Sequence, residues 1–283
     1  MNLQDLHNSI TNRLKATGIP EARLESQLLL RRAFSFTKAD FYSRLYDDMR
    51  DQSILANLEF TVKERLTRKP LAYILGSVEF FGRQFSVNPS VLIPRQETEV
   101  LVEHCVGLLN TSATKSQFVA DVGTGSGIIA VTLAAEIPRL QVIAIDRSPK
   151  ASAMALGNSI ALGTKDFVNC ITGDLLTSLQ CQFSLIVANL PYIPTENIKT
   201  LQPEVSLHEP YLALDGGTDG LKIIEHLLAQ SQSRLLRGGH IVLEIDPPHS
   251  SQVSDLCQTY FPGCKAIFLN DLNGDTRVVS IQV

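Results

Sequence analysis

The chain has 283 residues, of which 44% are hydrophobic and 19% are charged, a composition typical of a globular protein with one large and one small domain. No stretch of about 18 uncharged apolar residues predicts a membrane span, and the polar segment Met1–Lys15 lacks the apolar centre of a signal peptide, so we expect a cytoplasmic protein. The net charge of −4 is divided unevenly, +2 over residues 1–80 and −6 over the rest, without the long basic run of a general nucleic-acid binder, and we expect no direct nucleic-acid binding.

Cysteine and histidine spacing gives no sign of a metal or disulfide site. The five cysteines are scattered, odd in number and form no C-x-x-C pair, so we expect buried free thiols. The histidines, among them His104, His208 and His240, show no metal-ligand spacing. We therefore predict no bound metal.

Residues 1–75 predict a small helical bundle. Apolar residues recur at three- and four-residue spacing, and Gly18, Pro20 and Pro70 interrupt the pattern. We expect three apolar stripes to form the core of the bundle: Leu3, Leu6, Ile10 and Leu14; Leu24, Leu28 and Ala33; and Leu55, Leu58, Val62 and Leu66.

The segment Glu79–Pro94 predicts a β-hairpin that connects the bundle to the rest of the chain. Its apolar residues are broken by Gly82 and by the Asn88-Pro89 turn signal. These apolar residues are Phe80, Phe81, Phe85, Val87, Val91 and Ile93.

After residue 96, apolar strand candidates alternate with helical segments such as Gly127–Glu136 and Pro149–Leu162. This order predicts a mostly parallel sheet with helices on both faces. The loop Asn270–Asp275 is too short for a crossover helix, so the last two strands must pair antiparallel, as in class I methyltransferases, which this order resembles. The strand candidates are Phe118–Val122, Val142–Ile145, Val168–Thr172, Phe183–Ala188, His240–Ile245, Lys265–Leu269 and Arg277–Val283.

A glycine-rich loop, Gly123–Gly127, follows the strand Phe118–Val122 and precedes a helix. Glycines let the backbone turn sharply and approach a ligand at a helix N-terminus, and Asp121 lies just before the loop. A dinucleotide fingerprint would need glycine at position 128, where the chain has Ile128. The spacing disfavours a nicotinamide enzyme and favours an adenosylmethionine loop, although a simple tight turn is the alternative.

Two further acids follow the next strands. Asp146 lies where such an acid accepts hydrogen bonds from ribose hydroxyls, and Ser148 fits the N-cap of the following helix better, which leaves Asp146 for a ligand. Asp174, followed by Leu175, ends the strand Val168–Thr172 and by analogy lies beside the adenine amine.

Asn189-Leu190-Pro191-Tyr192 follows the strand Phe183–Ala188 and resembles the signature of enzymes that methylate planar exocyclic or amide nitrogens. The lone pair of such a nitrogen is delocalised. An asparagine oxygen and the next backbone carbonyl can accept both N–H groups, hold the nitrogen in line with the methyl group and stabilise growing positive charge. The aromatic ring would exclude water. The alternative for Asn189 is a turn residue, and this motif alone does not separate amide from adenine substrates.

Three segments narrow the substrate. Val91–Glu99 reads V-L-I-P-R-Q-E-T-E, Glu209–Leu221 contains E-P, A-L, G-G and D-G-L in order, and Asp271–Arg277 reads D-L-N-G-D-T-R. With Pro70–Gly76 they resemble the bacterial release-factor glutamine methyltransferases. The sequence departs from that pattern at Gln96 and Leu190, where proline is usual, and at Asp246-Pro247-Pro248, where glycine is usual.

The resemblance implies an α/β fold, a class I methyltransferase with a Rossmann-like, mostly parallel sheet and an antiparallel C-terminal hairpin, plus a small N-terminal helical bundle and a β-hairpin linker. We expect residues 1–77 to form a substrate-docking domain, 78–95 the linker and 96–283 the S-adenosylmethionine-dependent methyltransferase domain.

The resemblance also implies S-adenosyl-L-methionine as cofactor, S-adenosyl-L-homocysteine as product, and the glutamine of the Gly-Gly-Gln loop of peptide chain release factors as acceptor. The expected catalytic residues are Asn189 and Tyr192; the substrate-binding residues are Arg95, Glu97, Asn189, Leu190, Pro191 and Tyr192; the cofactor-binding residues are Asp121, Gly123, Thr124, Gly125, Ser126, Gly127, Asp146, Asp174, Leu175 and Asn189.

The open alternatives are an RNA or DNA adenine-N6 methyltransferase, a ribosomal-protein glutamine methyltransferase and a catalytically inactive adaptor. The charge of −6 on residues 81–283 disfavours a nucleic-acid substrate, and ribosomal-protein enzymes usually have P-R-S-P where this chain has Pro94-Arg95-Gln96-Glu97. Intact Asn189 and Tyr192 disfavour the adaptor. Arg95, Glu97 and Glu99 have a second interpretation, as a solvated helix start.

Overall fold

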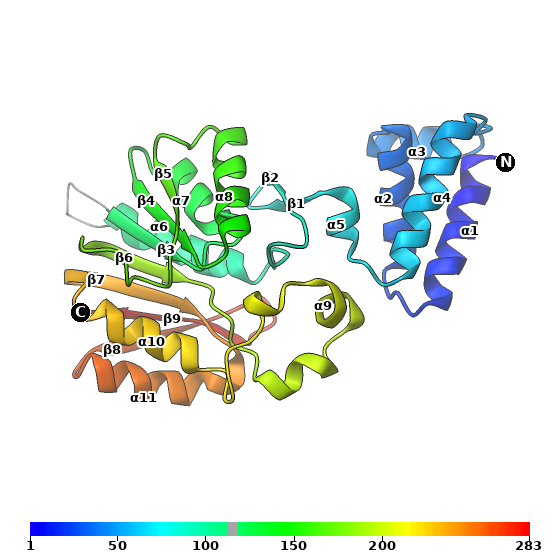
Figure 1. Ribbon diagram of the computed structural model, residues 1–283. Coiled ribbons are helices and arrows are strands. Elements are labelled where there is room, and N and C mark those ends of the chain that lie inside the picture. The colour runs from blue at the N-terminus through cyan, green and yellow to red at the C-terminus, as the bar shows by residue number, and fades with distance from the viewer. Residues whose placement is uncertain (112–117) are drawn as a thin grey trace. The chain divides into compact units, whose positions relative to one another are not determined.

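The computed structural model describes residues 1–111 and 118–283 (Figure 1). The chain divides into two compact units. Unit 1 comprises Met1–Gly76 and Gln202–His208, and unit 2 comprises Ser77–Leu201 and Glu209–Val283. Residues 202–208 thus belong to the helical unit, although they lie within the range expected for the transferase domain. In the part of the chain that the structure describes, no helix is both long and apolar enough to cross a bilayer.

Unit 1 is a bundle of short helices, three of which have starts that are capped by side chains. Asn2, Thr37 and Asp51 each accept a backbone N–H from the first turn of the helix that follows. The helices are α1 (Leu3–Ala16), α2 (Ala22–Phe34), α3 (Lys38–Ser43), α4 (Gln52–Leu66), α5 (Leu71–Leu75) and, from far along the sequence, α9 (Pro203–His208).

The predicted bundle core is confirmed for most of the residues expected in it, but Leu24, Leu28 and Leu55 do not belong to the core cluster. The first and third stripes supply Leu3, Ile10, Leu14, Leu58 and Val62 to the core. Leu24, however, is 48% exposed. The buried face of α2 carries Ala22, Ser26, Leu29 and Leu30, and a residue two positions after Ala22 lies about 200° around the helix from it.

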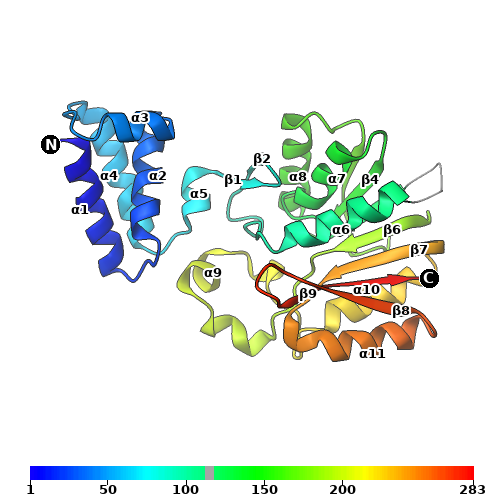
Figure 2. The same cartoon turned by 180° about the vertical axis from the view of Figure 1, so that it is seen from behind.

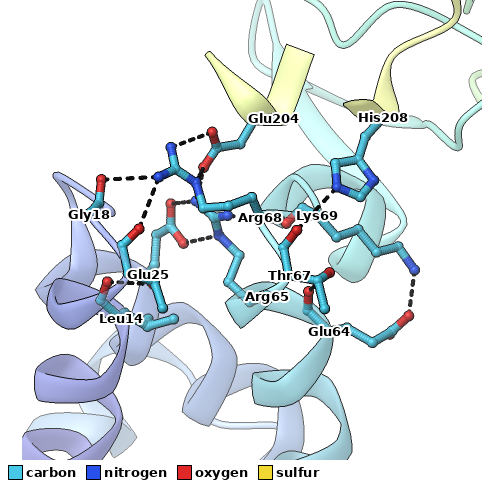
Figure 3. Close-up of polar contacts among 11 residues, drawn as sticks. Leu14, Gly18, Glu25, Glu64, Arg65, Thr67, Arg68, Lys69, Glu204 and His208 are labelled. Atoms are coloured by element: carbon cyan, nitrogen blue, oxygen red, sulfur yellow. Dashed lines mark hydrogen bonds and ion pairs between the residues drawn. The ribbon is translucent and has the colours of Figure 1, made fainter. Parts of the chain in front are cut away.

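An ion-pair cluster joins α2, α4 and α9 within unit 1 (Figure 3). The Arg65 side chain is only 3% exposed and lies 2.5 Å from Glu25 and 3.0 Å from Glu204. Arg68 contacts the other oxygen of Glu204 at 2.6 Å and donates to the Thr17 carbonyl at 2.9 Å. Because both arginines bind one carboxylate, they fasten α9 to the bundle (Figure 3).

Unit 2 is built on a seven-stranded sheet in the order β5-β4-β3-β6-β7-β9-β8, and the predicted fold class is confirmed (Figure 2). The first five strands in this order are parallel, and β9 pairs antiparallel with both β7 and β8. The strands are β3 (Phe118–Val122), β4 (Gln141–Asp146), β5 (Val168–Thr172), β6 (Phe183–Ala188), β7 (Leu235–Glu244), β8 (Lys265–Asn270) and β9 (Thr276–Gln282).

Helices cover both faces of this sheet because alternate strand residues point to opposite sides. Val119 on β3 packs in the cluster that contains α6 and α7, whereas its neighbour Ala120 packs in the cluster that contains α10 and α11. The bounds of these elements are α6 (Thr98–Thr111), α7 (Ile128–Glu136), α8 (Pro149–Ala161), α10 (Lys222–Ser231) and α11 (Ser250–Tyr260), with 3₁₀ turns η1 (Thr195–Thr200), η2 (Tyr211–Ala213) and η3 (Pro247–His249).

Both predicted hairpins are present. The first consists of β1 (Ser77–Phe80) and β2 (Arg83–Ser86). It starts two residues before the predicted segment Glu79–Pro94 and ends at Ser86, so the Asn88-Pro89 turn signal lies outside it. The chain after β2 leaves strand geometry, yet Val87, Val91 and Ile93 remain buried. Glu99 accepts the Phe81 N–H at 2.8 Å and so ties the turn of this hairpin to the start of α6.

Candidate active site

A cavity of about 1200 Å³ opens at the carboxyl ends of the parallel strands. It lies where the strand order reverses, because β4 and β5 lie on one side of β3 and β6 and β7 lie on the other. Open α/β sheets bind ligands at this position. Its walls include most residues expected at the site, namely Arg95, Gly123, Thr124, Gly125, Ser126, Asp146, Asp174, Leu175, Asn189, Leu190 and Pro191. Four expected residues do not line it: Asp121, Gly127, Glu97 and Tyr192.

The glycine-rich loop between β3 and α7 needs glycine at three positions. Gly123, Gly125 and Gly127 have φ angles of +75°, +57° and +83°, which L side chains rarely adopt. A Cβ at Gly127 would lie 3.0 Å from the Ala155 Cβ, and one at Gly123 would lie 2.9 Å from Leu190 Cδ2. The loop therefore combines a sharp turn with close packing.

Asp121 supports this loop from inside the protein. Its side chain is fully buried, and its Oδ2 accepts the Thr124 hydroxyl at 2.6 Å and the Ala130 N–H at 3.0 Å. Burial raises the pKa of Asp121 to about 7. Its other oxygen, Oδ1, has no partner among the described residues.

Asp146 ends β4 and faces the glycine-rich loop. Ser148 caps α8, as predicted, but Asp146 is not left wholly for a ligand. Its Oδ2 accepts the Gly125 N–H at 2.9 Å and its Oδ1 accepts the Ser148 N–H at 2.8 Å. Burial raises the pKa of Asp146. A carboxylate has about four lone-pair sites, so both oxygens retain accepting capacity.

The segment Asn189–Tyr192 follows β6 and borders the cavity. Leu190 is 4% exposed and its side chain fills the space above Gly123. The backbone after Leu190 is held by the motif Glu209–Leu221 through two hydrogen bonds. The Ile193 N–H donates to the Leu214 carbonyl, and the Gly216 N–H donates to the Ile193 carbonyl. Apolar packing and these bonds fix the segment where the related family uses proline.

Two glycines of the motif Glu209–Leu221 allow this close backbone contact. A Cβ at Gly216 would lie 2.8 Å from the Pro191 carbonyl oxygen, and one at Gly220, whose φ is +79°, would overlap the Tyr192 carbonyl oxygen. The G-G-x-D-G order is therefore explained by close backbone contact with the Asn189–Tyr192 segment.

Glu209, in the motif Glu209–Leu221, forms an ion pair with Arg95, in the motif Val91–Glu99. Arg95 pairs with Glu209 at 2.5 Å, and the Glu209 side chain is 1% exposed. The other Glu209 oxygen accepts the Ile93 N–H at 3.2 Å. This pair joins two cavity walls, so Arg95 has a structural partner besides any substrate that it contacts.

The motif Asp271–Arg277 stabilises the loop between β8 and β9. Asp271 accepts the N–H groups of Asn273 and Asp275, at 2.8 Å and 3.0 Å, and pairs with Arg277 at 3.1 Å. Arg277 also lies 3.9 Å from Asp246. The Asp246 carboxylate, present where the related family usually has glycine, thus gains a cationic neighbour.

Two residues that the sequence did not single out contact the Asn189 segment. Thr98, at the start of α6, accepts a hydrogen bond from Asn189 Nδ2 at 3.2 Å. The Thr98 hydroxyl donates to Glu244 at 2.7 Å, and the Tyr192 hydroxyl lies 3.4 Å from the same carboxylate. The available signal was position: Thr98 lies within the V-L-I-P-R-Q-E-T-E segment, and Glu244 lies two residues before Asp246, where the sequence departs from the family pattern.

The cavity fits S-adenosylmethionine as a bound cofactor. Gly123 and Gly125 bring backbone without side chains to the cavity wall, and Asp146 borders the cavity beside them. The buried Asp121 carboxylate supports this loop from inside the protein. A cationic sulfonium and ammonium suit a cavity wall supported by carboxylates. In residues 1–111 and 118–283, no cluster of three His, Cys, Asp or Glu side chains is placed to hold a metal ion.

Replacing Asp146 by alanine should weaken cofactor binding by about 1.5–3 kcal/mol, the range of a hydrogen bond to a charged group. The matched control is Asp166→Ala, which removes an exposed carboxylate outside the cavity and should leave affinity unchanged. Calorimetry measures both. Equal affinity in the Asp146 and Asp166 variants would remove Asp146 from the binding site.

Comparisons with known proteins give the family. Residues 5–76 match the family described as the PrmC N-terminal domain, and residues 96–204 match the methyltransferase small domain. The release factor glutamine methyltransferase of Geobacter sulfurreducens is 39% identical over 95% of this chain and 93% of its own length. That of Deinococcus radiodurans is 34% identical over 99% and 98%.

A solved structure shares the fold. The hMettl16 catalytic domain, in complex with a 3′UTR hairpin, superposes with a TM-score of 0.56 at 13% identity and covers 81% of each chain. This likeness extends to the fold alone. The identity and coverage of the curated relatives, with the matched N-terminal and methyltransferase domains, show that the chain belongs to the release factor glutamine methyltransferase family.

Proposed function

We propose that this protein transfers the methyl group of S-adenosylmethionine to the side-chain amide nitrogen of the glutamine in the Gly-Gly-Gln loop of peptide chain release factors. The observation that carries the proposal is Asn189. Its amide lies on the cavity wall, and its Nδ2 is engaged by Thr98. The acceptor oxygen Oδ1 therefore faces away from Thr98, available for a substrate N–H.

Different residues around the cavity would bind the cofactor and the substrate amide. Gly123–Gly127 and Asp146 would hold the cofactor, which supplies an electrophilic methyl group when bound. Asn189 Oδ1 and the Leu190 carbonyl would accept the two N–H groups of the glutamine amide. They would orient its nitrogen and stabilise positive charge as it develops there.

No strong base is needed beforehand in this scheme. Once the nitrogen carries the methyl group its proton is acidic, and water can take it. The Tyr192 ring is partly buried against the core of unit 2. It would support, from behind, the apolar wall that Leu190 and Pro191 form beside the amide. Its hydroxyl points to Glu244 rather than to the cavity, which suits a supporting role and not a proton acceptor.

The runner-up substrates are adenine in RNA or DNA and the glutamine of a ribosomal protein. A mixture of labelled methyl donor, release factor, ribosomal RNA and ribosomal protein distinguishes them. We expect label in the release factor. Label confined to RNA or to the ribosomal protein would overturn the proposal.

We further propose that unit 1 docks the release factor, since the cavity residues all belong to unit 2. Hydrogen exchange of the full chain should then show slower exchange in α1–α4 when release factor and S-adenosylhomocysteine are added together. The control is S-adenosylhomocysteine alone, which should protect unit 2 only. Protection by the factor that is limited to residues 77–201 and 209–283 would contradict docking by unit 1.

A further inference from the structure

Three side chains from separate elements form a short series of hydrogen bonds that runs from the buried Glu244 to Thr98 and Asn189 at the cavity wall. Glu244 ends β7, Thr98 begins α6 and Asn189 follows β6. Thr98 is fully buried and Glu244 is 2% exposed. The Thr98 hydroxyl lies 2.7 Å from Glu244 Oε2, and Asn189 Nδ2 lies 3.2 Å from the Thr98 oxygen.

The chemistry of these three groups fixes which of them donates and which accepts in each hydrogen bond. An ionised carboxylate only accepts hydrogen bonds, and a hydroxyl has a single hydrogen to donate. Thr98 therefore donates to Glu244, and its oxygen can only accept from Asn189. The Asn189 amide must then turn its NH₂ group toward Thr98, which directs Oδ1 away from it.

We propose that Thr98 and Glu244 are positioning residues that hold the Asn189 amide with its acceptor oxygen toward the substrate. The inference rests on the proposed function, because it assigns Asn189 Oδ1 to a glutamine N–H. Without these two hydrogen bonds, Asn189 could flip and present its NH₂ group to the substrate NH₂ group, so that two hydrogen-bond donors would face each other. Neither Thr98 nor Glu244 touches the substrate amide in this scheme.

The direction of these hydrogen bonds depends on the charge of Glu244. A protonated Glu244 could donate to Thr98, which would then donate to Asn189 and reverse its amide. Burial raises the pKa of Glu244, the Glu97 carboxylate raises it further, and the Arg277 guanidinium and the Thr98 and Tyr192 hydroxyls oppose the rise. The turnover number should therefore fall as acid protonates Glu244.

The first test compares Thr98→Val, which keeps the shape and removes the hydroxyl, with Thr98→Ser, which restores it. We expect Thr98→Val to lower kcat about tenfold or more, the scale of a small misplacement of a reacting group. Cofactor Kd and the KM for release factor should stay within about twofold of wild type. Thr98→Ser should recover most of kcat.

The second test uses Glu244→Gln and the pH dependence of kcat. Glutamine cannot titrate and can donate to Thr98, so we expect lower kcat at neutral pH and loss of the acid limb that Glu244 causes in wild type. An acid limb unchanged in Glu244→Gln would contradict the relay, as would Thr98→Val turning over within twofold of wild type or Thr98→Ser as slow as Thr98→Val. Should one variant not fold, the others still decide. A wild-type protein that does not methylate the factor would instead defeat the proposed function.

Discussion

Replacement of Asn189 by alanine should lower kcat on a release factor by about 10²–10³-fold, or 3–4 kcal/mol, by analogy with the loss of one oxyanion-hole donor. The contact between Asn189 Oδ1 and the substrate N–H strengthens as charge builds on nitrogen. A contact that strengthens only in the transition state appears in kcat rather than in ground-state binding. Cofactor affinity, measured by titration, should change little.

The control for Asn189→Ala is Asn197→Ala, a replacement in the exposed turn η1 on the same connecting segment. That variant should retain wild-type turnover. An Asn189→Ala protein that folds, binds cofactor and turns over within about threefold of wild type would reduce Asn189 to a turn residue.

Replacement of Arg65 by alanine should destabilise unit 1 by about 3 kcal/mol, because it leaves the mostly buried Glu25 carboxylate without its partner. The Glu25 side chain is 13% exposed and pairs with Arg65 through two hydrogen bonds. Glu204 keeps Arg68, so the loss should be larger in α2 and α4 than in α9. Hydrogen exchange of the amides in these helices measures their opening free energies.

Arg13→Ala is the matched control for Arg65→Ala. Arg13 makes an equally well-formed pair with Glu59, but the two side chains are 34% and 44% exposed. Water screens such a pair, so its loss should cost less than about 1 kcal/mol. Equal destabilisation by the two replacements would show that burial of Arg65 does not decide its contribution.

The features that could be predicted from the sequence are local in the chain. The glycine-rich loop after β3 and the two-strand C-terminal hairpin each depend on residues that are close in the sequence. Even the outermost pair of the hairpin, Lys265 and Gln282, belongs to one short segment. The family resemblance then correctly indicated the sheet on which these motifs lie, and most expected site residues line one cavity.

The features that could not be predicted depend on distant pairs. Thr98 and Glu244 are 146 residues apart and meet only because α6 packs over the carboxyl end of β7. Glu204 is 139 residues from Arg65, and nothing around it indicates that α9 belongs to the helical unit. The exposed Leu24 shows that apolar spacing leaves the phase of a short helix ambiguous where polar residues such as Ser26 are buried.

The most direct test of the central claim is tandem mass spectrometry of a release factor after incubation with this protein and S-adenosylmethionine. We predict one added methyl group on the side-chain amide of the glutamine in the Gly-Gly-Gln loop, with no modification when Asn189→Ala replaces the wild-type protein for the same short time. A methyl group on another residue, or an unmodified factor after complete incubation with folded, cofactor-binding wild type, would contradict the account.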